Sequence, residues 1–151
     1  MSLIGLRDNR RGSSFIETAI LIPVMLLMCC GTMDFARAVY AGISMASAAR
    51  AGVQFGALTP GNSGKTTDMA QAAKNDAADL GLDNVTATTR NFCSCNDGGG
   101  EVACSGTVTC NGATPYGYVS VTANYTFRPV VPWPGIPQSL VLAGTAKMRV
   151  Q

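Results

Sequence analysis

Apolar residues dominate one long stretch near the start of the chain. From Ser13 to Met33 there are 21 residues, and Glu17 is the only charged residue among them. A helix of that length is roughly 31 Å long at about 1.5 Å per residue, which matches a bilayer hydrocarbon core of about 30 Å. The pattern therefore predicts a membrane-spanning helix at about residues 13–33. Pro23 removes one backbone hydrogen bond and is expected to kink or loosen this helix.

The helix is expected to continue beyond the membrane, so that it covers residues 13–58. After Asp34, apolar or small residues recur every three or four positions, which places them on one face of a helix. This predicted face consists of Phe35, Val39, Ile43, Ala46, Ala49, Val53 and Ala57. Its small residues allow close approach to a sheet of the same subunit. Asp34 and Arg37 can pair at the outer membrane face, or can simply form a polar boundary there.

Residues 59–151 are predicted to form a small exported domain. Pro60 and Gly61 break the first helix, and a short amphipathic helix follows until Gly81 ends it. The apolar positions of this short helix are Met69, Ala73, Ala77 and Leu80. Alternating apolar and polar residues then predict strands. The expected strands are Val85 to Phe92, Tyr118 to Phe127 and Leu140 to Val150, and the buried face of the second is Val119, Val121, Ala123, Tyr125 and Phe127.

Between the last two strands lies a proline-rich segment. Prolines fix the backbone in an extended loop around the single tryptophan, Trp133. The amphipathic ring of Trp133 is expected either to contact a partner or the membrane interface, or to pack within its own loop. The predicted fold class is thus α+β, with a long N-terminal helix packed on a small, mostly antiparallel sheet, one short helix and a disulfide loop.

Six cysteines fall into two groups. Cys29 and Cys30 lie within the predicted span and are interpreted as small packing residues. The other four lie in a polar loop on the exported side, where an oxidising environment favours disulfides. These disulfide candidates are Cys93, Cys95, Cys104 and Cys110. A zinc site is disfavoured, because the first pair has C-x-C spacing and the chain has no histidine.

The pairing of these cysteines depends on where the chain turns. Four cysteines allow three connectivities. If residues 98–100, which are all glycine, form a hairpin turn, then Cys95 lies opposite about Cys104 and Cys93 is left for Cys110. Nested bridges are therefore the expected connectivity.

The residues before the span carry a topology and processing signal. Three arginines within residues 1–12 place the N-terminus in the cytoplasm by the positive-inside rule, and the rest of the chain outside. If the chain is cut after Gly12, residues 1–12 are a leader, Ser13 becomes the N-terminus and Glu17 becomes the fifth residue. Glu17 can then pair with the new α-amino group of a neighbouring subunit, which offsets the burial of both charges. The alternatives are an uncleaved signal anchor and a conventional signal peptide.

This order of glycine, glutamate and apolar span resembles the prepilin peptidase site of type IV pilins and pseudopilins. The match extends along the first helix, which resembles TadE-like proteins of the tight-adherence (Tad, or Flp) pilus system. The residues that carry it are the Gly12 and Glu17 pair, Pro23, the cluster of Asp34, Phe35 and Arg37, and Ala48, Ala49, Arg50, Ala51 and Gly52. The resemblance implies a pilin-like fold and a minor pseudopilin, a structural component or initiator of pilus assembly.

The resemblance also implies partners and a location. The expected partners are prepilin peptidase, other pilins and pseudopilins, the inner-membrane pilus assembly machinery and membrane lipid. The expected location is the bacterial cytoplasmic (inner) membrane, with a single pass, a cytoplasmic N-terminus and a periplasmic C-terminal domain, or an extracellular pilus after incorporation. The alternatives are a membrane-anchored periplasmic binding or interaction module that is not assembled into a pilus, and an anchored enzyme.

Composition argues against catalysis and nucleic-acid binding. The chain has no histidine, and no motif places an acidic pair. Residues 64–66 read GKT, but Thr59 stands where a phosphate-binding loop requires its first glycine. After removal of the leader the side chains carry no net formal charge, and the remaining basic residues are scattered rather than clustered. No enzymatic activity, cofactor, metal or nucleic acid is therefore expected.

Overall fold

The computed structural model describes residues 10–95, 99–104, 109–132 and 135–150, and the side chains from Phe15 onward. A 48-residue helix opens the described chain, and short helices and four strands follow it. The elements are α1 (Arg10–Ala57), α2 (Pro60–Ser63), α3 (Thr66–Asp76), η1 (Ala78–Leu80), η2 (Leu82–Asn84), β1 (Val85–Ser94), β2 (Glu101–Val102), β3 (Tyr116–Phe127) and β4 (Leu140–Arg149). The helix α1 thus begins at Arg10 rather than Ser13, and it continues through Pro23.

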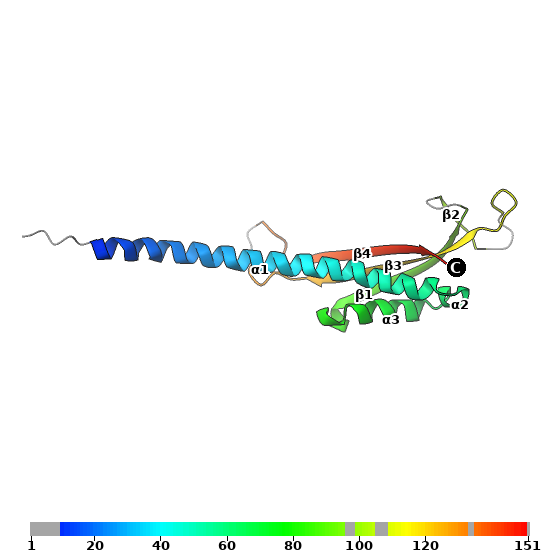
Figure 1. Ribbon diagram of the computed structural model, residues 1–151, viewed down its shortest axis with the longest axis horizontal. Helices are drawn as coiled ribbons and strands as arrows, with labels where there is room; N and C mark the ends of the chain where they lie inside the picture. Colours follow the sequence, from blue (N-terminus) through cyan, green and yellow to red (C-terminus); the bar gives the residue numbers. More distant parts are fainter. Residues whose placement is uncertain (1–9, 96–98, 105–108, 133–134, 151) are drawn as a thin grey trace, which may run out of the picture.

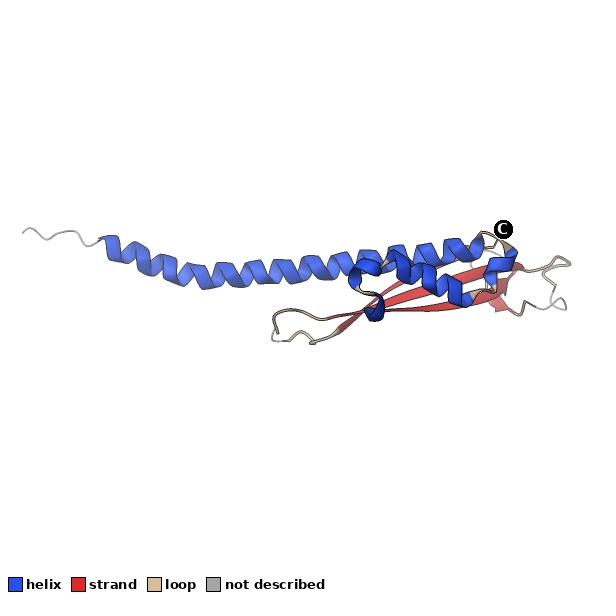
Figure 2. Cartoon of the chain, turned by 90° about the horizontal axis from the view of Figure 1, so that it is seen from below, coloured by secondary structure: helices blue, strands red, loops and turns tan. Residues whose placement is uncertain are grey.

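Two layers make up the folded domain. The four strands form one antiparallel sheet in the order β2-β1-β3-β4. The C-terminal half of α1 packs on β3 and β4, and α3 packs beside it on β1, so both helices cover the same face of the sheet (Figures 1 and 2). The N-terminal half of α1 extends away from this domain. The predicted pilin-like α+β architecture is confirmed.

The core lies between the two layers and follows the predicted strand and short-helix patterns. On β3, the residues Val119, Val121 and Ala123 are completely buried. On the short helix α3, Met69 and Ala73 face them, and Ala77 follows in the turn after α3. Gly81 adopts a positive φ of 86°, a conformation that glycine tolerates, and ends the η1 turn where the sequence places the stop.

The predicted face of α1 is correct only in its C-terminal part. Ala49, Val53 and Ala57 are buried against the sheet and α3, whereas Phe35, Val39 and Ile43 are exposed. The buried side of that earlier part carries Asp34, Ala41 and Met45 instead. Ala41 and Met45 lie two positions to either side of Ile43, so the helix is rotated about its axis relative to the predicted face.

Gly144 on β4 sets the closest contact between helix and sheet. It is buried, and a Cβ atom added there would lie 2.3 Å from the carbonyl carbon and oxygen of Met45. No side chain can occupy that space unless the backbones separate. An isolated glycine in a strand often marks such a close approach. Here it lets α1 lie directly on β4.

Candidate functional site

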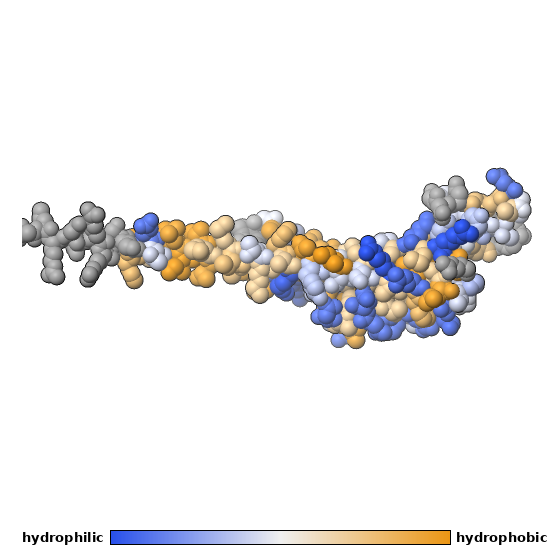
Figure 3. Space-filling view, in the orientation of Figure 1, coloured by the Kyte–Doolittle hydropathy of each residue, from blue (hydrophilic) through white to orange (hydrophobic). Residues whose placement is uncertain are grey.

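The N-terminal half of α1 extends from the folded domain with its side chains exposed (Figure 1). Every side chain from Phe15 to Cys30 is exposed, and none of the most apolar 18-residue window is buried. Figure 3 shows this half as a continuous apolar rod that leaves the domain. Its length and composition suit one crossing of a membrane.

The residues predicted to serve in processing and assembly lie at the start of this rod. Gly12 and Ser13 belong to the first turn of α1, and Glu17 follows one turn later with an exposed side chain. Glu17 is the only charged residue between Ser13 and Met33. Its carboxylate is therefore accessible from outside the subunit, and in an apolar assembly it would require a positive partner. The structure positions these three residues without testing their roles.

Asp34 lies where α1 meets the domain, and it joins two distant parts of the chain. Its carboxylate is 6% exposed and pairs with the Arg37 guanidinium at 3.1 Å, as the spacing predicts. It also accepts hydrogen bonds from the backbone N–H groups of Val130 and Val131, at 3.1 and 3.2 Å. These amides belong to the β3–β4 loop, 96 and 97 residues further along the chain. Asp34 thus fixes that loop to the helix.

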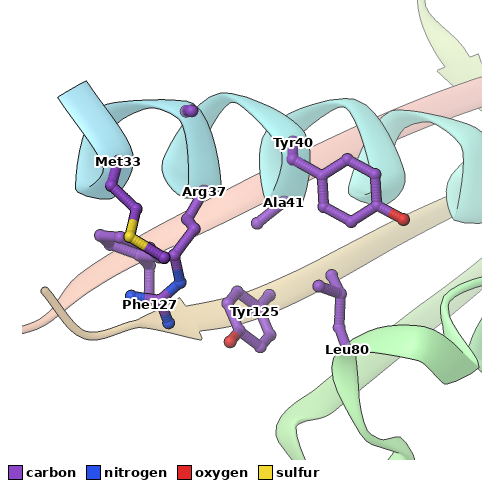
Figure 4. A pocket seen from close by; sticks show the side chains of 8 residues that line it. Met33, Arg37, Tyr40, Ala41, Leu80, Tyr125 and Phe127 are labelled. Atoms are coloured by element: carbon purple, nitrogen blue, oxygen red, sulfur yellow. The ribbon is translucent and has the colours of Figure 1, made fainter. Parts of the chain in front are cut away.

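An open pocket of about 330 Å³ lies on one side of this junction. Figure 4 shows side chains from α1, β3 and η1 around it. The Arg37 guanidinium lies 5.5 Å from the centre of the Phe127 ring, a cation–π contact. The remaining labelled side chains are Met33, Tyr40, Ala41, Leu80 and Tyr125. The lining is mainly apolar, so the pocket suits a hydrophobic side chain or acyl chain better than a polar substrate.

Tyr40 connects α1 to the η1 turn. Its hydroxyl donates a hydrogen bond to the Asp79 carboxylate. That hydrogen bond, together with the negative charge of Asp79, raises the pKa of Tyr40 above its ordinary value. Both side chains are exposed, so the contact is a surface tie between helix and turn.

Two disulfides join the four cysteines that follow α1, but their partners differ from the expected ones. Cys93 bonds to Cys104 and Cys95 bonds to Cys110, with Cα–Cα distances of 5.1 and 5.3 Å. The bridges are interleaved, so the predicted nested pairing is wrong.

The strand register explains this difference. β1 pairs with β2 so that Cys93 lies opposite Val102 and Ser94 lies opposite Glu101. This places the turn earlier than a turn centred on the three glycines would, and Cys104 becomes a near neighbour of Cys93 instead of Cys95. Cys95 then pairs with Cys110, whose backbone forms an isolated antiparallel β-bridge with Ala113. Gly98 itself lies outside the described residues.

The predicted site residues do not form one cluster. Glu17 and the end of α1 at Ala57 are 40 residues apart on one helix, which corresponds to roughly 60 Å. The disulfides lie at the domain end opposite to the apolar rod (Figure 1). Among the described residues, no group of three or more His, Cys, Asp or Glu side chains is arranged to hold a metal ion.

The sequence analysis did not predict two contacts that α1 makes with the folded domain. Nothing in the sequence links Asp34 to the loop, because the contact spans most of the chain. The close approach at Gly144 did carry a signal, namely an isolated glycine within an alternating strand pattern. Trp133 lies outside the described residues, so its expected contacts remain a prediction.

The comparison with protein families found a match in the N-terminal helix of the chain. The model of the family described as TadE-like protein matches residues 12–54, from the glycine before the apolar rod almost to the end of α1. Members of this family are generally non-enzymatic structural proteins. Neither the search of curated proteins nor the search of solved structures found a match. Over residues 12–54, which make up most of α1, the chain is therefore similar to the TadE-like protein family.

Proposed function

We propose that this protein is a minor pseudopilin of a Tad/Flp pilus, a structural component or initiator of its assembly, and that prepilin peptidase processes it after Gly12. Residues 13–33 anchor it in the inner membrane, with the N-terminus in the cytoplasm and residues 59–151 in the periplasm. The observation that carries the proposal is the apolar rod, which extends from the folded domain (Figure 1) and exposes large side chains and one carboxylate.

Glu17 is the residue through which the rod selects its neighbours. Cleavage after Gly12 creates an α-amino cation at Ser13, and both that cation and Glu17 would be costly to bury alone in an apolar assembly. Pairing Glu17 of one subunit with the α-amino group of the next offsets both costs. The exposure of the Glu17 side chain on the outside of the rod supports this role.

The exposed side of α1 beyond the membrane supports assembly as well. Phe35, Val39 and Ile43 are 72%, 44% and 65% exposed, and their spacing of four residues aligns them on one helix face. This exposed face continues the apolar surface of the rod. We propose that helices of other pilus subunits cover it, since large exposed apolar surfaces mark interaction sites.

Processing is tested by co-expression with an active prepilin peptidase. Intact-mass measurement should show that residues 1–12 are lost from the wild-type chain, and that Gly12→Val prevents the loss. As a control, Gly42→Val, on the same helix but where added atoms meet open space, should be cut normally. Retention of Met1 in the wild-type chain under these conditions would overturn the processing step.

Glu17→Ala separates assembly from anchoring. Removing a carboxylate from an apolar span eases insertion, so the variant should reach the membrane and be cut after Gly12. It should nevertheless fail to enter or initiate pili, as judged by piliation counts and by crosslinking to other pilins. Ile20→Ala, an exposed position on the same rod, provides the matched control and should assemble. Normal piliation with Glu17→Ala would remove the pairing mechanism and favour an anchored interaction module.

A further inference from the structure

We propose that the described parts of the β3–β4 loop, residues 128–132 and 135–137, are a second membrane contact, in which Val130 and Ile136 enter the outer interface of the bilayer. The inference rests on the proposed function only in taking residues 13–33 as the span. It adds a lipid-binding surface on the folded domain. Three independent features of the loop support it: its position, its backbone and its side chains.

The position of the loop follows from a shared pocket. Ile136 and Pro129 line one pocket together with Gly31, Asp34 and Phe35 of α1. Gly31 lies within the predicted span, three residues or roughly 4.5 Å closer to its centre than Asp34. The loop therefore reaches back along the helix past the point where the span ends. When residues 13–33 cross the bilayer, Ile136 is held at the level of the outermost turn of the span.

The backbone of the loop is suited to a water-poor environment. Unpaired N–H groups are costly in lipid, and proline has none. Four of the ten residues in 128–137 are prolines. The N–H groups of Val130 and Val131 are both accepted by the Asp34 carboxylate. Asp34 in turn pairs with Arg37 on its own helix. The N–H groups of Val130 and Val131 therefore keep their hydrogen bonds when this part of the loop lies against lipid.

The side chains complete the surface. Val130 is 72% exposed and Ile136 is 56% exposed, and neither is needed for the core. On the adjacent turn of α1, Met33 is exposed as well. Exposed apolar residues beside a membrane span point to lipid as their partner, because α1 fixes their height relative to the bilayer.

Lipid contact is tested with single-tryptophan variants of the full chain, built on Trp133→Phe. Ile136→Trp reports on the loop, Met25→Trp on the span, and Leu58→Trp on the far end of α1, roughly 36 Å from Asp34. Each is reconstituted in phosphatidylcholine vesicles that contain brominated phosphatidylcholine, a contact quencher of tryptophan. We expect loss of emission for the Met25 and Ile136 reporters but not for the Leu58 reporter, although Leu58 is at least as exposed as Ile136. Phosphatidylcholine brominated near the headgroup should quench the Ile136 reporter more than phosphatidylcholine brominated near the end of its acyl chain.

The outcomes separate this inference from the proposed anchor. Quenching at Met25 without quenching at Ile136 would overturn the loop contact and leave the anchor standing. Absence of quenching at all three positions would overturn both. If the Ile136 reporter escapes lipid quenching and becomes more accessible to aqueous acrylamide when the protein is diluted in the membrane, a second copy covers the loop and the lipid contact is wrong.

Asp34 acts as a positioning residue, which a second variant tests. Asp34→Asn removes the charge and one of the two accepting oxygens, so the loop should detach from α1. The quenching of the Ile136 reporter by lipid should then fall, whereas the quenching of the Met25 reporter should not change. Asp83→Asn, an exposed carboxylate in η2, is the control and should change neither. Unchanged quenching at Ile136 in Asp34→Asn would show that the loop is held without Asp34.

Discussion

The two halves of α1 are both apolar, yet they use different side chains for different partners. The N-terminal half presents large residues such as Ile20, Leu21 and Leu26, all exposed. The C-terminal half turns mostly small residues to the sheet, including Ala41, Ala48, Ala49, Gly52 and Gly56. Small residues bring backbones close within one subunit, whereas large ones provide apolar surface for lipid or other helices. Side-chain size, more than hydropathy, distinguishes the side of this helix that packs on the sheet from the parts that are exposed.

Truncation of one large side chain on each side of α1 tests this comparison most strongly. Met45 is completely buried, so Met45→Ala should lower the free energy of unfolding by about 2–5 kcal/mol. Ile43→Ala, two residues earlier on the exposed side, should change it by no more than about 0.5 kcal/mol. Urea unfolding of the full chain in detergent micelles, followed by near-ultraviolet circular dichroism, measures both. If both substitutions lower the free energy of unfolding equally, Ile43 has a packing partner within the subunit.

The close approach at Gly144 should give the next largest effect. Gly144→Ala places a methyl group against the Met45 backbone and should cost about 1–3 kcal/mol, as overpacking does. Gly42→Ala is the matched control, because its added methyl group meets open space and removal of a helical glycine should stabilise α1 by up to about 1 kcal/mol. The same unfolding measurement applies. Tolerance of Gly144→Ala would show that helix and sheet can separate without loss of the core.

The smallest expected effect concerns the surface tie at Tyr40. Because the pKa of Tyr40 is raised in the folded chain, the stabilisation by its bond to Asp79 is present below the ordinary tyrosine pKa of about 10 and is lost as the pH rises through the folded value. Tyr40→Phe should therefore lower the unfolding temperature slightly at neutral pH. At strongly alkaline pH the two chains should converge. A constant difference between them across this range would contradict the assignment.

Much of the fold was predictable because its patterns are local. The alternation along Tyr118 to Phe127 and Leu140 to Arg149 gives β3 and β4 directly, and β3 begins only two residues before the predicted start. Pro60 marks the end of α1. In each case the period of apolar residues, or a residue with a fixed backbone preference, carries the information within a few positions of the chain.

The missed features depend on how distant segments align. The face of α1 around Ile43 was misassigned because more than one set of positions has a spacing of three or four, and the sheet covers Ala41 and Met45, two positions to either side of Ile43. The cysteine pairing failed because the register of β1 on β2 places Cys93, and not Cys95, near Cys104. The bond from Asp34 to the β3–β4 loop joins segments that no local pattern relates. Alignment between segments is a property of the packed chain, so no single stretch of sequence contains it.

The parallel course of α1 and the strands also has a mechanical consequence. β3 and β4 run lengthwise along α1 (Figure 1) and are joined by ten residue pairs. A pull on the membrane end of α1 therefore reaches the sheet as shear along its strands and not as peeling from one end. Under shear the rungs of the β3–β4 ladder share the load and must yield together, whereas under peeling they would break one after another.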